Sequence, residues 1–442
     1  MRVAIVIPPV RDLYFTPQRA SFLGPHTLSS ILGKHGVEHA IFNAVRGRGR
    51  PVPLPDELGY LAPYLCRRYF FTEYRRYGIE DDRMARIVAD YRPDIILLSC
   101  FAFAYATDAL SLSRALKKAL PHATLIVGGA GVSAYPDYFL RNAPVDYAVR
   151  GEVGDSLVAI VRDPGAFTVD EGLVDAPGMK VSGRSFEPVI PVIVPIRESR
   201  DTIYYSTMLS RGCPNNCSFC SVKLTFPSYQ RASLDDVDDL FTTVACSNKT
   251  AHVNFEDDNL GMDFDYLSRI LDRLGSRTGG NFSFSMENGT DFHALDERKL
   301  AFLKRRNIRR LNVSFVSSNE RVLAENGRRY SPRDFTGFVR SALSCSIPVT
   351  AYLIAGLPGE DYRSINEGID FLAGLPVLIG ISPFYPVPGI SGFEEKNRFD
   401  KISPNLCKGT SFYPWNMCST DELIHLFIRA RESNLIKGTS IN

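Results

Sequence analysis

Apolar residues in the first part of the chain gather in short runs that alternate with segments of helical periodicity. The runs are rich in Val, Ile and Leu, as buried strands are, and they cover residues 3–7, 37–42, 95–99, 124–127 and 147–149. Helical spacing of apolar residues covers 28–34, 81–90 and 108–119. Strands that alternate with helices build a parallel sheet with helices on both faces. The pattern therefore predicts a Rossmann-like, doubly wound α/β domain over residues 1–161.

A second alternating series runs through residues 201–395. Its roughly six β/α units predict a partial (β/α)6 TIM barrel rather than a second Rossmann-like domain. Residues 162–200 are rich in Pro and Gly with little periodicity, which predicts a linker or a short hairpin. Residues 396–442 form a C-terminal extension with one further helix, and the pattern assigns no fold to the insertion at 46–80.

Length and charge narrow the classes of protein. A chain of 442 residues is long enough for two domains. Its 51 basic and 49 acidic residues are nearly balanced, which removes the electrostatic argument for nucleic acid or a membrane surface as a partner. The N-terminal apolar run is too short for a signal peptide, and no apolar stretch is long enough to span a bilayer. We therefore expect a cytoplasmic protein.

Three of the nine cysteines stand together directly after a predicted strand. Cys213, Cys217 and Cys220 form a Cys-x3-Cys-x2-Cys loop. Three thiolates on one loop can bind three irons of a 4Fe–4S cubane and leave the fourth iron open for a small chelating ligand. The alternative is a zinc site, which would need a fourth ligand. His252 and Cys246 are the candidates for that ligand.

The cysteine loop, with Phe219 before its last cysteine, resembles the signature of the radical S-adenosylmethionine (SAM) superfamily. The resemblance extends over about residues 201–390. It implies that the three cysteines are catalytic ligands of a 4Fe–4S cluster and that SAM lies across the strand ends. The SAM contacts that it implies, each at or near a strand end, are Phe219, Glu256, Asp257, Glu287, Ser314 and Ile354.

The N-terminal domain resembles the cobalamin-binding domain that is fused to some radical SAM barrels. The resemblance is carried by residues 69–78, 92–96, 127–129 and 150–152. Glycines at a strand end let the backbone approach a bulky ligand closely. The cobalamin contacts that the resemblance implies are Arg11, Tyr14, Ser99, Phe101, Gly128, Gly129, Gly131 and Glu152.

The loop after the first strand departs from the pattern of many cobalamin proteins. It reads Pro-Pro-Val-Arg-Asp-Leu-Tyr over residues 8–14, without the histidine that ligates cobalt in those proteins. We therefore expect cobalamin to bind without that histidine. Arg11, Tyr14 or a water would then face the lower side of the cobalt.

Together the two resemblances imply a cobalamin-dependent radical SAM methyltransferase. Such an enzyme moves a methyl group from methylcobalamin to an unactivated carbon after the 5′-deoxyadenosyl radical has removed a hydrogen atom, and the cofactors carry the difficult chemistry. The compact build is similar to that of enzymes that C-methylate a glutamine of methyl-coenzyme M reductase, so a peptide or protein substrate is one expectation. An electron donor such as flavodoxin or ferredoxin is another.

Two alternatives stay open. One is a cobalamin-dependent radical cyclase, rearrangement or ring-oxidation enzyme without methyl transfer. The other is a cobalamin or iron–sulfur sensor that binds its cofactors without turnover. The mass of the product separates the first from a methyltransferase, and reductive cleavage of SAM would exclude the second.

Overall fold

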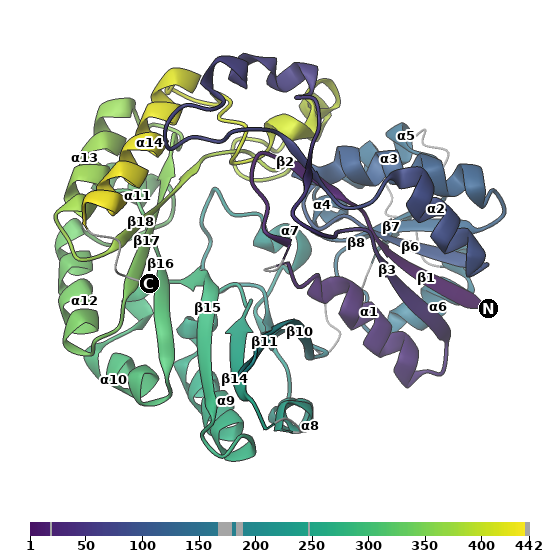
Figure 1. Cartoon of the computed structure of the whole chain (residues 1–442), viewed down its shortest axis with the longest axis horizontal. Helices are drawn as coiled ribbons and strands as arrows, with labels where there is room; N and C mark the ends of the chain where they lie inside the picture. The colour runs from purple at the N-terminus through teal and green to yellow at the C-terminus, as the bar shows by residue number, and fades with distance from the viewer. Residues whose placement is uncertain (18–19, 167–178, 183–188, 246–247, 438–442) are drawn as a thin grey trace.

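Two sheets of mainly parallel strands organise the chain and lie at opposite sides of the molecule (Figure 1). The computed structural model describes residues 1–17, 20–166, 179–182, 189–245 and 248–437. Cys246, one of the two candidates for a zinc ligand, lies outside the described residues. No helix in these ranges combines the length and apolar character needed to cross a membrane.

The N-terminal sheet has six strands in the order β3-β1-β6-β7-β8-β9, and every pair is parallel. The strands are β1 (Arg2–Ile7), β3 (Glu38–Asn43), β6 (Ile95–Ser99), β7 (Thr124–Gly128), β8 (Tyr147–Arg150) and β9 (Met179–Ser182). The helices of this part are α1 (Leu23–Lys34), α2 (Asp81–Asp90), α3 (Ala106–Ala119), α4 (Ala130–Ala134), α5 (Pro136–Asn142) and α6 (Ser156–Arg162). The predicted doubly wound sheet is confirmed.

Both faces of this sheet are buried, which explains why its strands read as continuous apolar runs. Along β1, Val3 and Ile5 belong to one core cluster, together with residues of α1 and α6. Ala4 and Val6 belong to another cluster, together with residues of α2 and α3. The chain leaves β1 for β3 on one side and returns to β6 on the other. Such a reversal opens a crevice at the carboxyl ends of the two strands, where ligands bind in this architecture.

The second sheet is a partial barrel of seven strands in the order β10-β11-β14-β15-β16-β17-β18. Its strands are β10 (Val192–Glu198), β11 (Thr202–Met208), β14 (Thr250–Phe255), β15 (Phe282–Thr290), β16 (Ile308–Val316), β17 (Val349–Ala355) and β18 (Leu378–Pro383). Only β10 is antiparallel to its neighbour, so six parallel strands remain as predicted.

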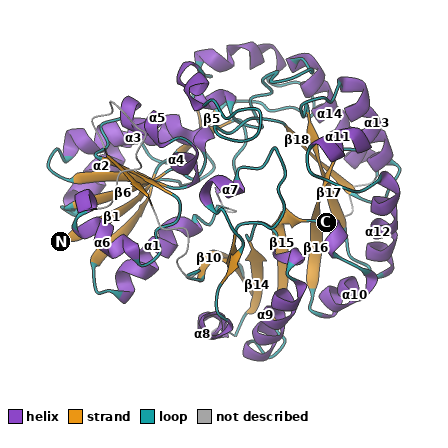
Figure 2. Ribbon diagram, turned by 180° about the vertical axis from the view of Figure 1, so that it is seen from behind, coloured by secondary structure: helices purple, strands orange, loops and turns teal. Residues whose placement is uncertain are grey.

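Helices wrap the outside of the barrel, and its strands line the inside (Figure 2). The helices are α8 (Leu234–Ala245), α9 (Phe264–Arg277), α10 (Glu297–Arg305), α11 (Glu320–Glu325), α12 (Pro332–Ser344), α13 (Tyr362–Ala373) and α14 (Thr420–Ile436). Burial alternates along β16: Leu311, Val313 and Phe315 are fully buried, whereas Asn312 and Ser314 are half-buried. One face of the strand thus packs on helices, and the other is left for polar groups and ligands.

The segment predicted as a linker contributes a strand to each sheet. β9 pairs with β8 of the N-terminal sheet, and β10 pairs with β11 of the barrel. The predicted domain boundaries themselves stay predictions.

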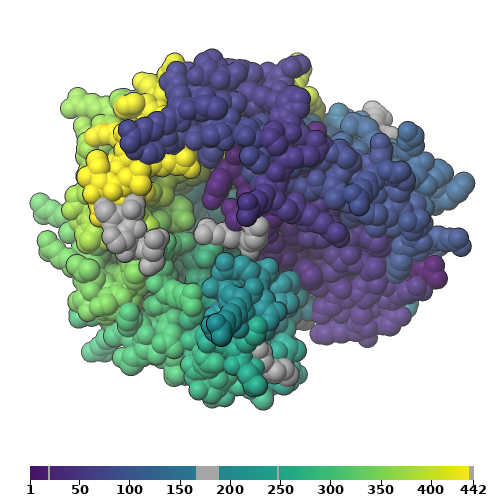
Figure 3. All heavy atoms as spheres, in the orientation of Figure 1, coloured from purple at the N-terminus to yellow at the C-terminus, as the bar shows by residue number. Residues whose placement is uncertain are grey.

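The insertion at 46–80 and the C-terminal extension lie side by side over one end of the barrel (Figure 3). Within the insertion, β4 (Arg50–Pro51) and β5 (Arg75–Tyr77) form a small sheet with β2 (Val10–Asp12), and a 3-10 segment, η2, covers Asp56–Tyr64. Tyr60 donates a hydrogen bond of 2.7 Å to the Ser411 carbonyl. The insertion therefore joins the two halves of the molecule.

Candidate active site

The cysteine loop begins where β12 (Ser210–Arg211) ends, just beyond the carboxyl end of β11, and it is followed by the short helix α7 (Val222–Thr225). Gly212 lies between β12 and Cys213 and has a φ of +74°. A Cβ at Gly212 would come within 2.3 Å of the Ser228 carbonyl oxygen. Only glycine allows this turn, and the turn brings the three thiols to the mouth of the barrel.

Asp257 fixes the approach to this loop. Its Oδ1 accepts hydrogen bonds from the Leu209 and Ser210 backbone N–H groups, at 3.1 and 2.6 Å, and from the Ser210 hydroxyl. Burial raises the pKa of Asp257 to about 6, against the opposing effect of these hydrogen bonds. Asp257 is predicted as a SAM contact, but the structure directs this carboxylate oxygen toward the chain before the cysteine loop.

A second set of side chains holds the loop from the far side of the barrel mouth. The Ser218 hydroxyl donates a hydrogen bond to Asn326 at 2.5 Å. Asn215 donates to Asp291 at 3.2 Å, and the same Asp291 oxygen accepts from Arg328 at 2.7 Å. The loop is therefore attached to the segments that follow β15 and α11.

The donor set fits an iron–sulfur cluster better than a single zinc ion. Within the described ranges no three His, Cys, Asp or Glu side chains converge on one metal position. A cubane needs no such point, because each thiolate binds a different iron. His252 is not available as a zinc ligand, since its two ring nitrogens lie 2.9 and 3.1 Å from the Ser283 and Ser285 hydroxyls.

The other predicted SAM contacts lie at the carboxyl ends of neighbouring barrel strands. Glu256 follows β14, and its carboxylate accepts a hydrogen bond of 2.8 Å from Ser21 of the N-terminal domain. Glu287 is exposed on β15, whereas Ser314 and Ile354 are half-buried on β16 and β17. Phe219 is partly buried and packs on the main core. The structure thus brings four of these positions to one rim, and Phe219 supports the loop beside it.

Three further polar residues at this rim are not among the predicted SAM contacts. Asp258 is half-buried close to Arg211 and the Gly212 backbone, and partial burial raises the pKa of its carboxyl group. Asn259 places its amide nitrogen 3.7 Å from the Cys213 sulfur. Arg328 is half-buried, and its positive charge opposes the desolvation that raises the pKa of Cys217. The run of acids after β14 was a signal for Asp258, whereas Arg328 is far from the loop in sequence.

The predicted cobalamin contacts gather at the carboxyl edge of the N-terminal sheet. Ser99 at the end of β6 pairs with Gly128 at the end of β7. Gly129 has a φ of +111°, and a Cβ there would lie 2.5 Å from the Cys100 carbonyl oxygen. A Cβ on Gly131 would lie 2.6 Å from the Ala102 backbone. Packing of the two loops against each other therefore explains Gly129 and Gly131, while Ser99 and Gly128 stay half-exposed at the edge.

Arg11 and Tyr14 differ in their freedom to meet a ligand. The Arg11 side chain donates a hydrogen bond of 2.5 Å to Asp108, which is fully buried. Tyr14 is 57% exposed. Phe101 packs its ring 4.7 Å from that of Tyr105. Of the two side chains proposed to face the cobalt, only Tyr14 is not held by an ion pair.

Glu152 turns toward the barrel rather than along the cobalamin edge. It forms an ion pair of 3.1 Å with Arg211, directly before the cysteine loop. This ion pair and the Ser21–Glu256 hydrogen bond connect the carboxyl edges of the two sheets. The two predicted cofactor sites therefore face each other across one interface, which fits a corrinoid held opposite a cluster and SAM.

Family models agree with this division. The model described as the radical SAM superfamily matches residues 207–372, and the model described as the B12 binding domain matches residues 56–161. Among curated proteins, the chain is 22% identical over 311 residues to an uncharacterized methyltransferase of Pyrococcus horikoshii, covering 66% of this chain and 67% of that protein. It is 20% identical over 403 residues to the cytidylyl-2-hydroxyethylphosphonate methyltransferase of Streptomyces wedmorensis, covering 79% and 72%.

Solved structures share the fold. The radical SAM methyltransferase TsrM from Kitasatospora setae, solved with cobalamin and a 4Fe–4S cluster, has a TM-score of 0.62 at 14% identity, covering 91% of this chain and 75% of that one. The cobalamin-dependent radical enzyme OxsB, solved with aqua-cobalamin and SAM, has a TM-score of 0.58 at 14% identity, covering 97% and 56%.

A B12-binding domain followed by a radical SAM barrel defines the class of this protein. The chain thus combines the two domains of cobalamin-dependent radical SAM enzymes, and it is similar to methyltransferases among them. Its cofactors are a 4Fe–4S cluster, SAM and cobalamin. The residues predicted to hold them stay predictions, with the placements described above.

Proposed function

We propose that this enzyme transfers a methyl group to an unactivated carbon of its substrate. When bound, the cluster and SAM supply a 5′-deoxyadenosyl radical that takes a hydrogen atom from the substrate, and the corrinoid supplies the methyl group. The observation that supports the proposal is the pair of contacts Glu152–Arg211 and Ser21–Glu256, which join the two predicted cofactor sites. A substrate between the two sites would meet both.

In this proposal the chain's own groups bind and position. Cys213, Cys217 and Cys220 hold the cluster as thiolates. Asp257 and Gly212 set the course of the loop. An electron from outside is required, and flavodoxin or ferredoxin is the donor we propose.

The substrate class is a separate question. The relatives act on small molecules by their names: a cytidylyl-2-hydroxyethylphosphonate in one case and bacteriochlorophyllide d in another. A structure of TsrM is described with a tryptophan substrate. A peptide or protein substrate, such as a glutamine of methyl-coenzyme M reductase, stays a prediction.

One relative favours an alternative without methyl transfer. The anaerobic magnesium-protoporphyrin IX monomethyl ester cyclase of Rubrivivax gelatinosus is 27% identical over 193 residues, covering 38% of this chain and 34% of that protein. A cyclase would cleave SAM to 5′-deoxyadenosine and form no S-adenosylhomocysteine.

The test is anaerobic purification with reconstitution of the cluster and cobalamin. We expect iron–sulfur and corrinoid absorption bands, and both 5′-deoxyadenosine and S-adenosylhomocysteine after SAM and a reductant are added. Changing Cys213, Cys217 and Cys220 together to alanine should abolish the 5′-deoxyadenosine, whereas Cys66→Ala, at an exposed cysteine outside the loop, should not. Cleavage that survives the triple change, or zinc at the loop, would contradict the proposal. 5′-Deoxyadenosine alone would favour the cyclase.

A further inference from the structure

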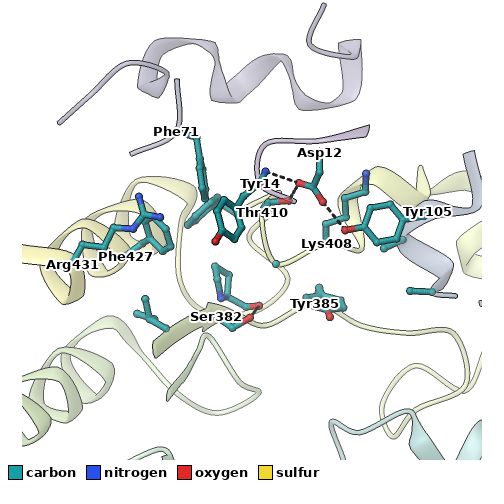
Figure 4. Close-up of a pocket in the computed structure, with 16 residues that line it drawn as sticks. Asp12, Tyr14, Phe71, Tyr105, Ser382, Tyr385, Lys408, Thr410, Phe427 and Arg431 are labelled. Carbon is teal, nitrogen blue, oxygen red and sulfur yellow. Dashed lines mark hydrogen bonds between the residues drawn. The ribbon is translucent and has the colours of Figure 1, made fainter. Parts of the chain in front are cut away.

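A pocket of roughly 370 Å³ lies where the N-terminal domain, the barrel and the C-terminal extension meet (Figure 4). Its walls come from β2 and the loop after it, Phe71 of the insertion, the loop after β6, the end of β18, and α14 with the segment before it. This volume is near the lower limit of the range for small-molecule sites. The loops that carry Tyr14 and Tyr105 also carry predicted cobalamin contacts, so the pocket borders the predicted corrinoid site.

Aromatic rings form much of the wall. Phe71, Phe412 and Phe427 are buried and pack together with ring centroids 5.2 to 6.3 Å apart. Tyr14 and Tyr385 line the same pocket, yet they are 57% and 37% exposed. A flat apolar molecule in the pocket would cover these exposed rings.

Arg431 supplies the positive charge at one side of the pocket. Its guanidinium carbon lies 4.3 Å from the Phe427 ring centroid and 5.2 Å from that of Phe71, and one nitrogen donates to the Tyr69 carbonyl at 2.8 Å. In the described part of the chain no carboxylate lies within ion-pair distance of Arg431. An arginine stays charged and keeps further N–H donors for an anion.

On the opposite side of the pocket, the charges of the lining residues offset each other. Figure 4 shows Asp12, Lys408 and Tyr105 together there, away from Arg431. Asp12 accepts hydrogen bonds from the Tyr105 hydroxyl at 2.7 Å and from the Thr410 hydroxyl. Lys408 donates to the Arg11 carbonyl at 2.7 Å, and its charge offsets that of Asp12. The charge left over in the lining is the single positive charge of Arg431.

We propose that this pocket is the substrate site and that it selects a flat apolar compound bearing one carboxylate, which pairs with Arg431. The rings of Phe71, Phe427 and Tyr385 would cover the apolar part. This inference rests on the proposed function for the identity of the bound compound as a substrate. The recognition itself requires no turnover and can be measured alone.

The test uses the full chain reconstituted with cluster and cobalamin, without SAM or reductant. Two probes of the same shape, 3-phenylpropionate and its neutral amide, are titrated by calorimetry or ligand-observed NMR. A hydrogen-bonded charge pair contributes about 1.5 to 3 kcal/mol, so we expect the carboxylate to bind at least about tenfold more tightly than the amide. Arg431→Gln should reduce that ratio to about one, and Arg431→Lys should restore part of it.

Arg429→Gln is the matched control, because Arg429 lies on the same helix but pairs with Asp370, away from the pocket. It should leave the tenfold ratio unchanged. Equal binding of both probes, no binding of either, or an unchanged ratio in Arg431→Gln would overturn the inference. If SAM cleavage and methyl transfer persist in that case, only the substrate class is wrong. If they fail while the carboxylate preference holds, the proposed function is wrong instead.

Discussion

Buried acids are placed around the barrel mouth with fewer partners than their burial demands. One carboxylate oxygen of Asp257 accepts three hydrogen bonds, whereas its other oxygen has no hydrogen-bond partner. Glu360, in the turn after β17, is 1% exposed and accepts from the Ser317 hydroxyl on one oxygen, and its second oxygen also has no partner. Burial of a carboxylate without full hydrogen bonding favours its protonated form.

Glu360 makes stability fall as pH rises. Burial raises its pKa from 4.5 to about 7, so folding takes up a proton between these values, and the stabilising proton is lost as pH passes 7. Glu360→Gln resembles the neutral form. We expect it to match the original protein near pH 4.5 and to be more stable by about 3 kcal/mol at pH 8. Thermal unfolding across pH measures this, with the exposed Glu367→Gln as control. A constant difference at all pH values would contradict the assignment.

At the scale of single residues, the sequence predicts candidate cluster ligands better than it predicts which side chains contact the predicted site residues. The spacing of Cys213, Cys217 and Cys220 predicts the cysteine loop as the cluster site, because the three candidate ligands are close in the chain. Arg328 and Asp291 are more than 70 residues beyond the loop's start, so only the fold brings them to it. Arg11 and Glu152 are predicted as cobalamin contacts, but each forms an ion pair with an oppositely charged side chain. No local sequence pattern predicts these two ion pairs.

At the scale of elements, contacts between loops of the two sheets fix the predicted cofactor sites relative to each other. The loop after β8 carries Glu152, and β12 carries Arg211, whose side chain is 5% exposed. Asp257 and Asp258 lie close enough to Arg211 for its charge to lower the pKa of each carboxyl group against burial. Arg211 therefore neutralises acids from both domains immediately before the cysteine loop.

Replacing Arg211 should destabilise the cysteine loop. Breaking a buried ion pair costs about 3 to 5 kcal/mol, because the remaining charges stay uncompensated. We expect Arg211→Met to lower both the unfolding temperature and the iron retained per chain after desalting. Glu152→Gln should retain more iron than Arg211→Met, because Arg211 and its neighbour Asp258 are both still present in that variant. Arg231→Met, which breaks an exposed pair with Asp263, is the control. Full iron content in Arg211→Met would show that the ion pair does not support the loop.

The hydrophobic pattern predicts the central strands of the N-terminal sheet but not the strands β9 and β10. Strands of the N-terminal sheet are buried on both faces, so their apolar runs stand out. Residues 162–200, which include β9 and β10, are predicted as a linker or a short hairpin, because prolines and glycines interrupt the segment. Pairing with β8 and β11 stabilises these strands, and pairing between distant segments leaves no periodic signal.

At the scale of the whole molecule, aromatic packing joins the insertion to the C-terminal extension. The Phe70 ring lies 5.1 Å from that of Phe412 and 6.0 Å from that of Phe427 on α14. Glu57 of the insertion accepts hydrogen bonds from Ser403 and Asn405 of the extension, at 2.6 and 2.8 Å. These contacts close one side of the interface that contains both predicted cofactor sites, although the sequence pattern alone predicts no fold for the insertion.

Phe70→Ala should therefore open this side of the molecule without unfolding either sheet. Phe70 is buried in the aromatic cluster but does not line the pocket of Figure 4. Loss of a buried phenylalanine costs about 3 to 5 kcal/mol, and here the cost falls on the contact between insertion and extension. We expect faster hydrogen exchange in η2 and in the first turns of α14, with β1 and β6 unchanged. Phe302→Ala, on the outside of the barrel at α10, should leave exchange in η2 unchanged. If Phe70→Ala accelerates exchange in β1 and β6 as strongly as in η2, the insertion supports the N-terminal core rather than the closure of the interface.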